Sequence, residues 1–191
     1  MKVVGVNGSA RKGGNTTMLI EAAFEPLRAA GHDCELIELA KLDIRGCTAC
    51  GKCREKADRK CHGRKDDGNE VIARMFDADA ILLGSPTYFA DITPELKAII
   101  DRAGYVARGN GNLFSRKPGA AVVAVRRAGA IHAFDSINHF FLIGEMVVVG
   151  SSYWNVGIGG PKGAVAEDAE GIATMHRLGE NMSWVMERLA R

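Results

Sequence analysis

The sequence has no long apolar run and almost no excess of either charge. No stretch reaches the roughly 18 consecutive apolar residues that a transmembrane helix needs. The apolar segment that begins at Val3 is broken by Asn7-Gly8-Ser9, which makes it too short for a signal peptide. The formal net charge is only +2, whereas a nucleic-acid-binding domain is expected to carry a strongly basic face. We therefore expect a cytoplasmic protein with no membrane and no nucleic-acid partner.

The cysteines do not suit a disulfide framework. The 191 residues contain five cysteines, an odd number in a chain without an evident export signal. Cys34 stands apart from the other four, in a predicted strand, and is expected to be a small core residue. Apolar residues make up 47% of the chain and charged residues 25%, which is typical of a globular protein. The length favours one domain over residues 1–191.

Short apolar segments alternate with longer segments of helical spacing. Strands are predicted over residues 2–6, 34–39, 80–84, 120–125 and 146–149, and helices over 15–30, 69–77, 94–103, 130–144 and 167–189. This alternation predicts an α/β protein in which a five-stranded parallel sheet carries helices on both faces. Residues 45–68 are charged, Cys-rich and poor in large apolar side chains. We interpret them as an insertion after the second strand that cannot build a core of its own.

The turn after the first predicted strand has the composition of a phosphate-binding loop. It leads into a helix whose first backbone amides are free to bind an anion. The residues expected to hold the anion are Ser9, Arg11, Gly14, Asn15, Thr16 and Thr17. Neither the Walker pattern nor G-x-G-x-x-G is present, so a monophosphate is favoured over ATP or a pyrophosphate. The alternative is a well-capped turn with Asn15 as the helix cap.

Two further loops follow the third and fourth predicted strands. With the strand order 2-1-3-4-5, the crevice between the first and third strands brings these loops beside the phosphate loop. The residues expected there are Ser85, Pro86, Thr87, Tyr88 and Phe89 from one loop, and Arg126, Arg127 and Gly129 from the other. Amides and aromatic rings suit a heterocycle, and arginines suit an anionic group. The alternatives are core positions for the two aromatics and solvated surface positions for the two arginines.

Three motifs in this order resemble those of the NADPH-dependent FMN reductase family, and in particular its iron–sulfur flavoproteins. They are Gly8-Ser9-x-Arg11-x3-Asn15-Thr16, Gly84-Ser85-Pro86-Thr87-Tyr88-Phe89 and Leu96-Lys97-Ala98-x2-Asp101-Arg102. The resemblance implies a flavodoxin-like three-layer sandwich with FMN in the crevice. It implies that Ser9, Arg11, Asn15, Thr16 and Thr17 hold the phosphate, and that residues 86–89 border the isoalloxazine ring. No catalytic side chain is expected, because the flavin carries the redox chemistry.

Four cysteines are spaced as Cys47-x2-Cys50-x2-Cys53-x7-Cys61. The first three match the compact spacing of cubane ligands, and the absence of a second set favours one [4Fe–4S] cluster with all four ligands local. Basic residues outnumber acidic ones over residues 52–67, which would offset the charge of an anionic cluster. The gap before Cys61 is longer than the resemblance implies. The alternatives are a structural zinc site and a set of free, redox-labile thiols.

These observations favour an FMN-dependent oxidoreductase. It would take electrons from NAD(P)H and pass them to a small-molecule acceptor. The alternative is a non-enzymatic carrier that receives electrons from ferredoxin. The insertion follows the second strand, away from the expected crevice, so a cluster there would need the flavin of a neighbouring subunit. We therefore expect a homodimer or homotetramer.

Overall fold

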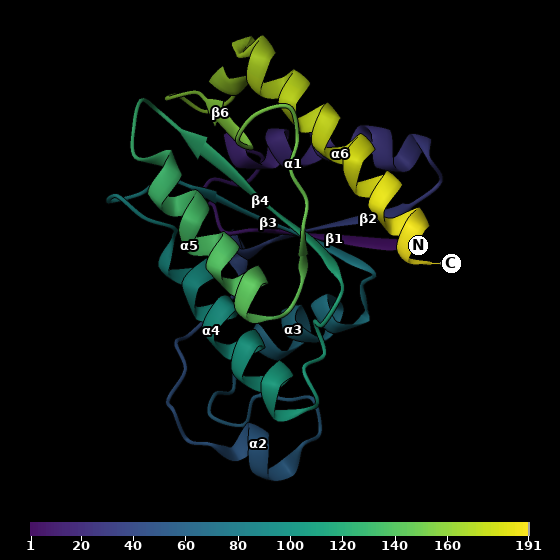
Figure 1. Ribbon diagram of the computed structural model, residues 1–191. Coiled ribbons are helices and arrows are strands. Elements are labelled where there is room, and N and C mark those ends of the chain that lie inside the picture. The colour runs from purple at the N-terminus through teal and green to yellow at the C-terminus, as the bar shows by residue number, and fades with distance from the viewer. Residues whose placement is uncertain (191) are drawn as a thin grey trace.

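A twisted parallel sheet forms the centre of the protein in the computed structural model, which describes residues 1–190 (Figure 1). Its strands are β1 (Lys2–Asn7), β2 (Asp33–Glu38), β3 (Ala80–Pro86), β4 (Pro118–Val125), β5 (Val147–Val148) and β6 (Val156–Ile158). The order is β2-β1-β3-β4-β5, and β6 also pairs with β4. All pairs are parallel. The predicted order is confirmed. Arg191, the last residue of the predicted domain, lies outside the described residues.

Helices cover both faces of the sheet and complete three layers. One face carries α1 (Asn15–Ala29) and α6 (Ala169–Leu189), and the other carries α3 (Gly68–Asp77), α4 (Pro94–Gly109) and α5 (Ala130–Ile143). Side chains of successive strand residues point to opposite faces. Accordingly Val3 and Leu82 pack with α1 and α6, whereas Val4 and Leu83 pack in the other core. Most buried strand residues are apolar, as expected of a parallel sheet covered on both faces.

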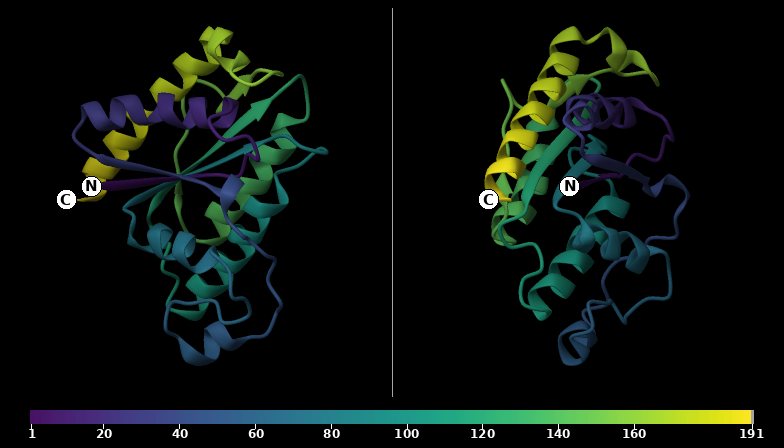
Figure 2. Two further views of the ribbon diagram at one scale, coloured as in Figure 1. Left: turned by 180° about the vertical axis from the view of Figure 1, so that it is seen from behind. Right: turned by 90° about the vertical axis from the view of Figure 1, so that its right-hand side faces the viewer.

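The Cys-rich insertion extends from one end of this sandwich (Figure 2). A short 3₁₀ turn, η1 (Leu39–Lys41), follows β2, and the insertion contains one short helix, α2 (Lys52–Lys56). Its return to α3 is held by a buried ion pair between Asp66 and Arg102 of α4. The Asp67 amide also donates to the Asp43 carbonyl, at 3.0 Å. The insertion therefore packs against α4, although it contributes few large apolar side chains.

Three elements differ from the sequence predictions. Helix α4 continues to Gly109 instead of ending at 103, because Val106 and Ala107 extend its buried face. The fifth strand shrinks to Val147–Val148, since β4 pairs with it only at Pro118 and Gly119. A sixth strand, β6, forms in a Gly-rich stretch that had no strand pattern, and it pairs with the other end of β4. Among the described helices, none is long and apolar enough to cross a membrane.

Candidate functional site

A crevice of about 390 Å³ opens at the carboxyl edge of the sheet. Four loops form it: those after β1, β3 and β4, which the sequence predicted, and the one after β6. The lining residues are Ser9, Arg11, Asn15, Thr16, Pro86, Thr87, Tyr88, Ala124, Arg126, Gly159 and Gly160. The structure thus brings together seven of the side chains predicted for this site and one predicted arginine of the third loop.

The loop after β1 is held in shape by short-range hydrogen bonds. The buried Asn7 accepts from the Ser9 amide at 2.9 Å and donates to the Thr17 hydroxyl at 2.9 Å. The Ser9 hydroxyl accepts from the Arg11 amide at 3.2 Å. Gly14 occupies the position before α1, where an added Cβ would lie 2.8 Å from the Arg11 carbonyl oxygen. The loop is therefore preorganised around the start of α1, and Gly14 is required by close backbone approach.

The start of α1 faces the crevice with donors that have no partner. Met18 is the first residue there whose amide bonds back to the turn, to the Gly14 carbonyl at 3.1 Å. The hydroxyls of Thr16 and Thr87 are both buried and both lack a hydrogen-bond partner. A buried polar group without a partner is costly, and free helix amides carry partial positive charge. These groups fit an anion such as the phosphate of FMN.

Two residues predicted for the phosphate bond elsewhere in this structure. The Thr17 hydroxyl donates to Glu38 at 2.6 Å and does not line the crevice. The Asn15 amide donates to the carbonyls of Gly159 and Pro161, at 2.7 and 2.9 Å. Asn15 therefore ties the loop after β6 to α1. It is not the cap of α1 either, since Gly14 holds that position without a side-chain bond. Their contact with a phosphate stays a prediction.

The loop after β3 supplies one wall of the crevice. Pro86, Thr87 and Tyr88 line it. Ser85 is buried behind them, where its hydroxyl donates to the Pro86 carbonyl at 2.7 Å and accepts from the Thr93 amide at 3.1 Å. Phe89 is fully exposed and Tyr88 is half exposed, so the alternative that both are core aromatics is wrong. Ser85 shapes the loop, and Phe89 stands outside the lining residues.

The loop after β4 contributes one of its three predicted residues to the lining. Arg126 lines the crevice, whereas Arg127 is exposed and does not. Gly129 is the residue before α5 and has φ of 86°, a conformation that favours glycine. Its role in this structure is the turn into α5, and its predicted contact with the ligand stays a prediction.

The fourth wall, formed by Gly159 and Gly160, was not predicted. A Cβ at Gly159 would lie 2.6 Å from the Val165 amide nitrogen, so only glycine fits there. The Arg11 guanidinium donates to the Gly160 carbonyl across the crevice, at 3.4 Å. The available signal was the run Val156-Gly-Ile-Gly-Gly-Pro161, whose small residues allow close backbone approach. The sequence alone does not show that this run returns to β4.

The four clustered cysteines surround one small cavity in the insertion, of about 10 Å³. Cys47 and Cys50 are exposed, and Cys53 and Cys61 are buried. The other side chains around it are Thr48, Ala49, His62, Arg102, Tyr105 and Val106. Burial raises the pKa of the Cys53 thiol above its ordinary value, and the neighbouring Cys61 and Cys47 add to the rise. Within residues 1–190, no three such ligands converge as they would around a single ion.

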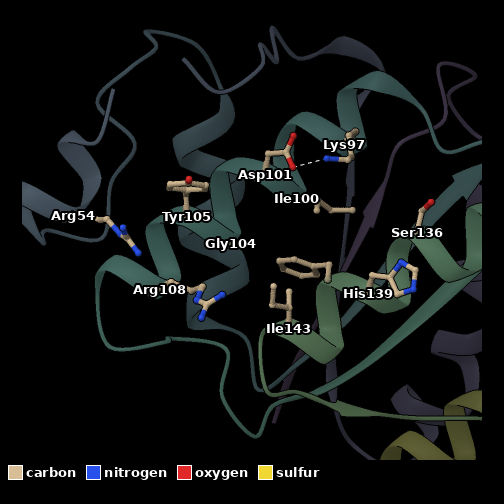
Figure 3. Close-up of a pocket in the computed structure, with 11 residues that line it drawn as sticks. Arg54, Lys97, Ile100, Asp101, Gly104, Tyr105, Arg108, Ser136, His139 and Ile143 are labelled. Carbon is tan, nitrogen blue, oxygen red and sulfur yellow. Dashed lines mark hydrogen bonds and ion pairs between the residues drawn. The ribbon is translucent and has the colours of Figure 1, made fainter. Parts of the chain in front are cut away.

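A cavity larger than the crevice lies away from it. It is a groove of about 620 Å³ between α4 and α5, with an apolar floor that includes Ile100 and Phe140. Figure 3 shows Arg54, Tyr105 and Arg108 at one end of it, near the insertion. Tyr105 lines both this groove and the cysteine cavity. The groove contains none of the residues that the sequence predicted for cofactor binding.

Several known proteins similar to this chain are named flavoproteins. Residues 1–160 match the family described as NADPH-dependent FMN reductase. An iron–sulfur flavoprotein of Methanocaldococcus jannaschii is 35% identical over 197 residues, which cover 100% of both chains. An iron–sulfur flavoprotein of Methanosarcina thermophila is 32% identical over 193 residues, covering 100% of this chain and 98% of the relative.

Solved structures share the fold at lower identity. A flavodoxin from the domain Archaea superposes with a TM-score of 0.65 at 16% identity, covering 98% of this chain and 99% of that one. A WrbA-like flavodoxin from Agrobacterium tumefaciens gives 0.67 at 15% identity, with 98% of both chains covered. Since the family match spans most of the sequence and the sheet has the flavodoxin order, the chain belongs to the NADPH-dependent FMN reductase family and is an FMN-dependent oxidoreductase with a flavodoxin-like fold.

Proposed function

We propose that this protein is an NAD(P)H-linked flavin or acceptor reductase that holds FMN in the crevice and a [4Fe–4S] cluster among its four clustered cysteines. The observation that carries the flavin site is the pair of buried, unpartnered hydroxyls in one crevice, that of Thr16 at the start of α1 and that of Thr87 in the loop after β3. A phosphate would satisfy the Thr16 hydroxyl and the free helix amides, and bound FMN would supply an acceptor to Thr87. No other group in the described crevice supplies them with an acceptor.

In this proposal one end of the crevice binds the phosphate of FMN and the other end binds its ring system. Ser9, Arg11 and Thr16 lie at the phosphate end, on the loop that Asn7 holds in shape. Pro86 and Tyr88 form a wall for the ring system, and Arg126 places a cation in the lining. Bound FMN supplies hydride acceptance and one-electron transfer. The half-exposed Tyr88 stands at the rim, which leaves that side open to a nicotinamide or an acceptor.

The cysteine cavity supports a cubane better than zinc. A cubane places each of its four thiolate ligands on a different iron, so the sulfurs need to surround a volume rather than converge on one point. The four cysteines surround one cavity, and the first three have the compact Cys-x2-Cys-x2-Cys spacing of cubane ligands. Two relatives of full length are themselves named iron–sulfur flavoproteins. These observations favour the cluster over zinc and over free thiols.

The two proposed cofactor sites share no lining residue. In the views of Figures 1 and 2, α2 lies at the opposite end of the molecule from the start of α6, and the crevice is lined in part by Gly159 and Gly160, which precede that helix in the chain. We therefore propose a homodimer or homotetramer in which the cluster of one subunit approaches the flavin of another. Sedimentation velocity of the loaded protein tests this, and a monomer would contradict it.

Anaerobic purification followed by an absorption spectrum and by iron, sulfide and FMN quantification tests both cofactors. We expect about one FMN and four irons per chain. Stopped-flow mixing with NADH and with NADPH then tests the reductase activity, which should bleach the flavin. A colourless protein that fails to bind added FMN would overturn the flavin site. A loaded protein that neither nucleotide reduces, but that reduced ferredoxin does, would instead establish the electron-carrier function.

A further inference from the structure

Arg102 is a fully buried cation held in a fixed orientation beside the cysteine cavity. Its Nη1 and Nη2 atoms donate to the two carboxylate oxygens of Asp66, both at 2.8 Å. Nη1 also donates to the Arg45 carbonyl at 3.1 Å. Gly68 leaves the space that the guanidinium fills, since a Cβ there would lie 2.3 Å from Nη1. Both side chains of the ion pair have no exposed surface.

One nitrogen of this guanidinium has no hydrogen-bond partner. The Nε atom of Arg102 is buried and unsatisfied, and Arg102 lines the same cavity as the four cysteines. Its charge is compensated there by the buried Asp66 carboxylate, which both of its Nη atoms contact. An unsatisfied buried N–H is costly. A ligand in this cavity that accepts a hydrogen bond from Nε would remove that cost.

We propose that Arg102 is a positioning residue for the cluster, donating its Nε–H to a cluster sulfide or to the Cys61 sulfur and raising the cluster's reduction potential. This inference rests on the proposed function, in which the cysteines hold a [4Fe–4S] group. Asp66 fixes the Nη side of the guanidinium, and Nε is the one nitrogen that makes no bond within the described residues, which leaves it for the sulfur. A lysine could not serve both partners in this way, because its three donors are on one atom.

The expected rise in the cluster's reduction potential follows from the charges involved. Reduction adds one electron to a group that is already anionic, and hydrogen bonds to its sulfurs favour the reduced form. A cation in a buried, weakly screened position acts in the same direction. Asp66 offsets part of the charge of Arg102, but its oxygens bond the far side of the guanidinium. The directional Nε–H contact is not offset.

The test is an EPR-monitored redox titration with dithionite on iron-loaded protein. We compare the wild type with Arg102→Lys, which keeps the charge but loses Nε–H. A second variant, Arg102→Gln with Asp66→Asn, replaces the ion pair by neutral groups and avoids a lone buried carboxylate. The control is Arg108→Gln, which removes an exposed cation from the same helix.

We expect the double variant to lower the reduced-to-oxidised ratio at a fixed potential about tenfold, which is about 59 mV for a one-electron couple. Arg102→Lys should shift in the same direction by less, and Arg108→Gln should match the wild type. A role in structure alone would reduce iron content or stability, while the loaded fraction titrates at the wild-type midpoint. That result overturns the inference.

The remaining outcomes separate this inference from the function on which it rests. Wild-type protein that takes up no iron overturns the proposed cluster, and this inference with it. Iron-loaded wild type with unshifted Arg102 variants overturns the inference alone. Folded Arg102 variants that hold no iron would show a role in assembly only, and would also overturn the claim about potential.

Discussion

Neighbouring hydroxyls at the start of α1 have opposite environments. Thr16 faces the crevice and its hydroxyl has no partner. Thr17, one residue later, bonds both Asn7 and Glu38. The two residues lie about 100° apart around the helix axis, because each residue advances the helix by that angle. From the sequence, both threonines were candidates for binding the phosphate. In the structure Thr16 lines the crevice, whereas Thr17 links α1 to β2 through Glu38.

Substitution of each threonine by valine should therefore have opposite consequences. Thr16→Val is expected to weaken FMN binding about tenfold or more, because it removes a hydrogen bond to a charged group worth about 1.5–3 kcal/mol. It should leave the unfolding free energy of the FMN-free protein nearly unchanged. Fluorescence titration with FMN and urea unfolding measure the two quantities.

Thr17→Val is the matched control for this change. It removes the Thr17 hydroxyl from both the Asn7 side-chain amide and the Glu38 carboxylate, which keep their bonds to the Ser9 and Gly13 amides, so we expect a loss of about 1 kcal/mol in the unfolding free energy. Its effect on FMN affinity should be smaller than that of Thr16→Val. If Thr17→Val weakened FMN binding as much as Thr16→Val did, the Thr17 hydroxyl would have to leave Glu38 for the phosphate.

The Cys34 thiol is predicted to be unreactive near neutral pH. Burial raises its pKa from 9.0 to about 11, so little thiolate is present to react at pH 8. Peptide mapping after treatment with iodoacetamide should show little alkylation of Cys34. Rapid alkylation under native conditions would show that β2 opens at this position.

The same shift makes the contribution of Cys34 to stability depend on pH. The folded protein holds this proton more tightly than the unfolded chain does. Stability from the neutral thiol is therefore complete below about pH 9 and is lost as pH rises through about 11. Urea unfolding at pH 8 and pH 11 should show a larger loss for the wild type than for Cys34→Ala. Equal losses would contradict the shifted pKa.

Asp168 joins two elements that the crevice needs. One of its carboxylate oxygens caps α6 by accepting from the Gly171 amide at 3.0 Å. The other accepts from the Ile158 amide at 2.6 Å, at the end of β6. The loop that follows β6 carries Gly159 and Gly160, which form the fourth wall. A helix cap therefore also fixes the position of that wall.

Asp168→Ala is expected to lower the unfolding free energy by about 1–2 kcal/mol, as loss of a side-chain cap does. FMN affinity should fall as well, because the wall at Gly159 becomes less restrained. Denaturant unfolding and FMN titration measure the two effects. Glu167→Ala is the control, since it removes an exposed carboxylate one residue earlier and should change neither.

Two separate cavities share one scaffold. The crevice depends on the carboxyl ends of β1, β3, β4 and β6, whereas the cysteine cavity depends on the insertion and α4. Each core cluster closes on its own face of the sheet. The crevice should therefore keep its shape when the cysteine site is empty.

Cys50→Ser should abolish the proposed cluster and retain FMN binding. Cys50 is exposed, so the change should alter the unfolding free energy by no more than about 0.5 kcal/mol. Iron and FMN quantification on the same preparation gives the answer, and Cys34→Ser is the control that should retain both. Loss of FMN together with iron would show that the two sites depend on each other.

Much of the architecture was predictable because its signals are local. Apolar periodicity located β1 to β4 and the five long helices, and the turn residues after β1 and β3 located the crevice. The Cys-x2-Cys-x2-Cys spacing predicted that these side chains lie together, and they do. Short elements could not be predicted. Strand β6 spans only Val156–Ile158, and three residues are too few to show the alternating pattern of a strand.

Local patterns in the sequence thus determined the alternation of strands and helices, the turn after β1 and the grouping of cysteines, since each depends on neighbouring residues, whereas the strand order was implied by the family resemblance. Only the tertiary structure decided which hydrogen-bond donors near the two cavities are bonded within the protein and which have no partner. Thr17 meets Glu38 across 21 residues of sequence, Arg102 meets Asp66 across 36, and Asn15 meets Gly159 across 144. The packing of the layers decides which residues become partners. A hydrogen bond requires that two atoms be close in space, and it does not depend on how far apart the residues are in the sequence.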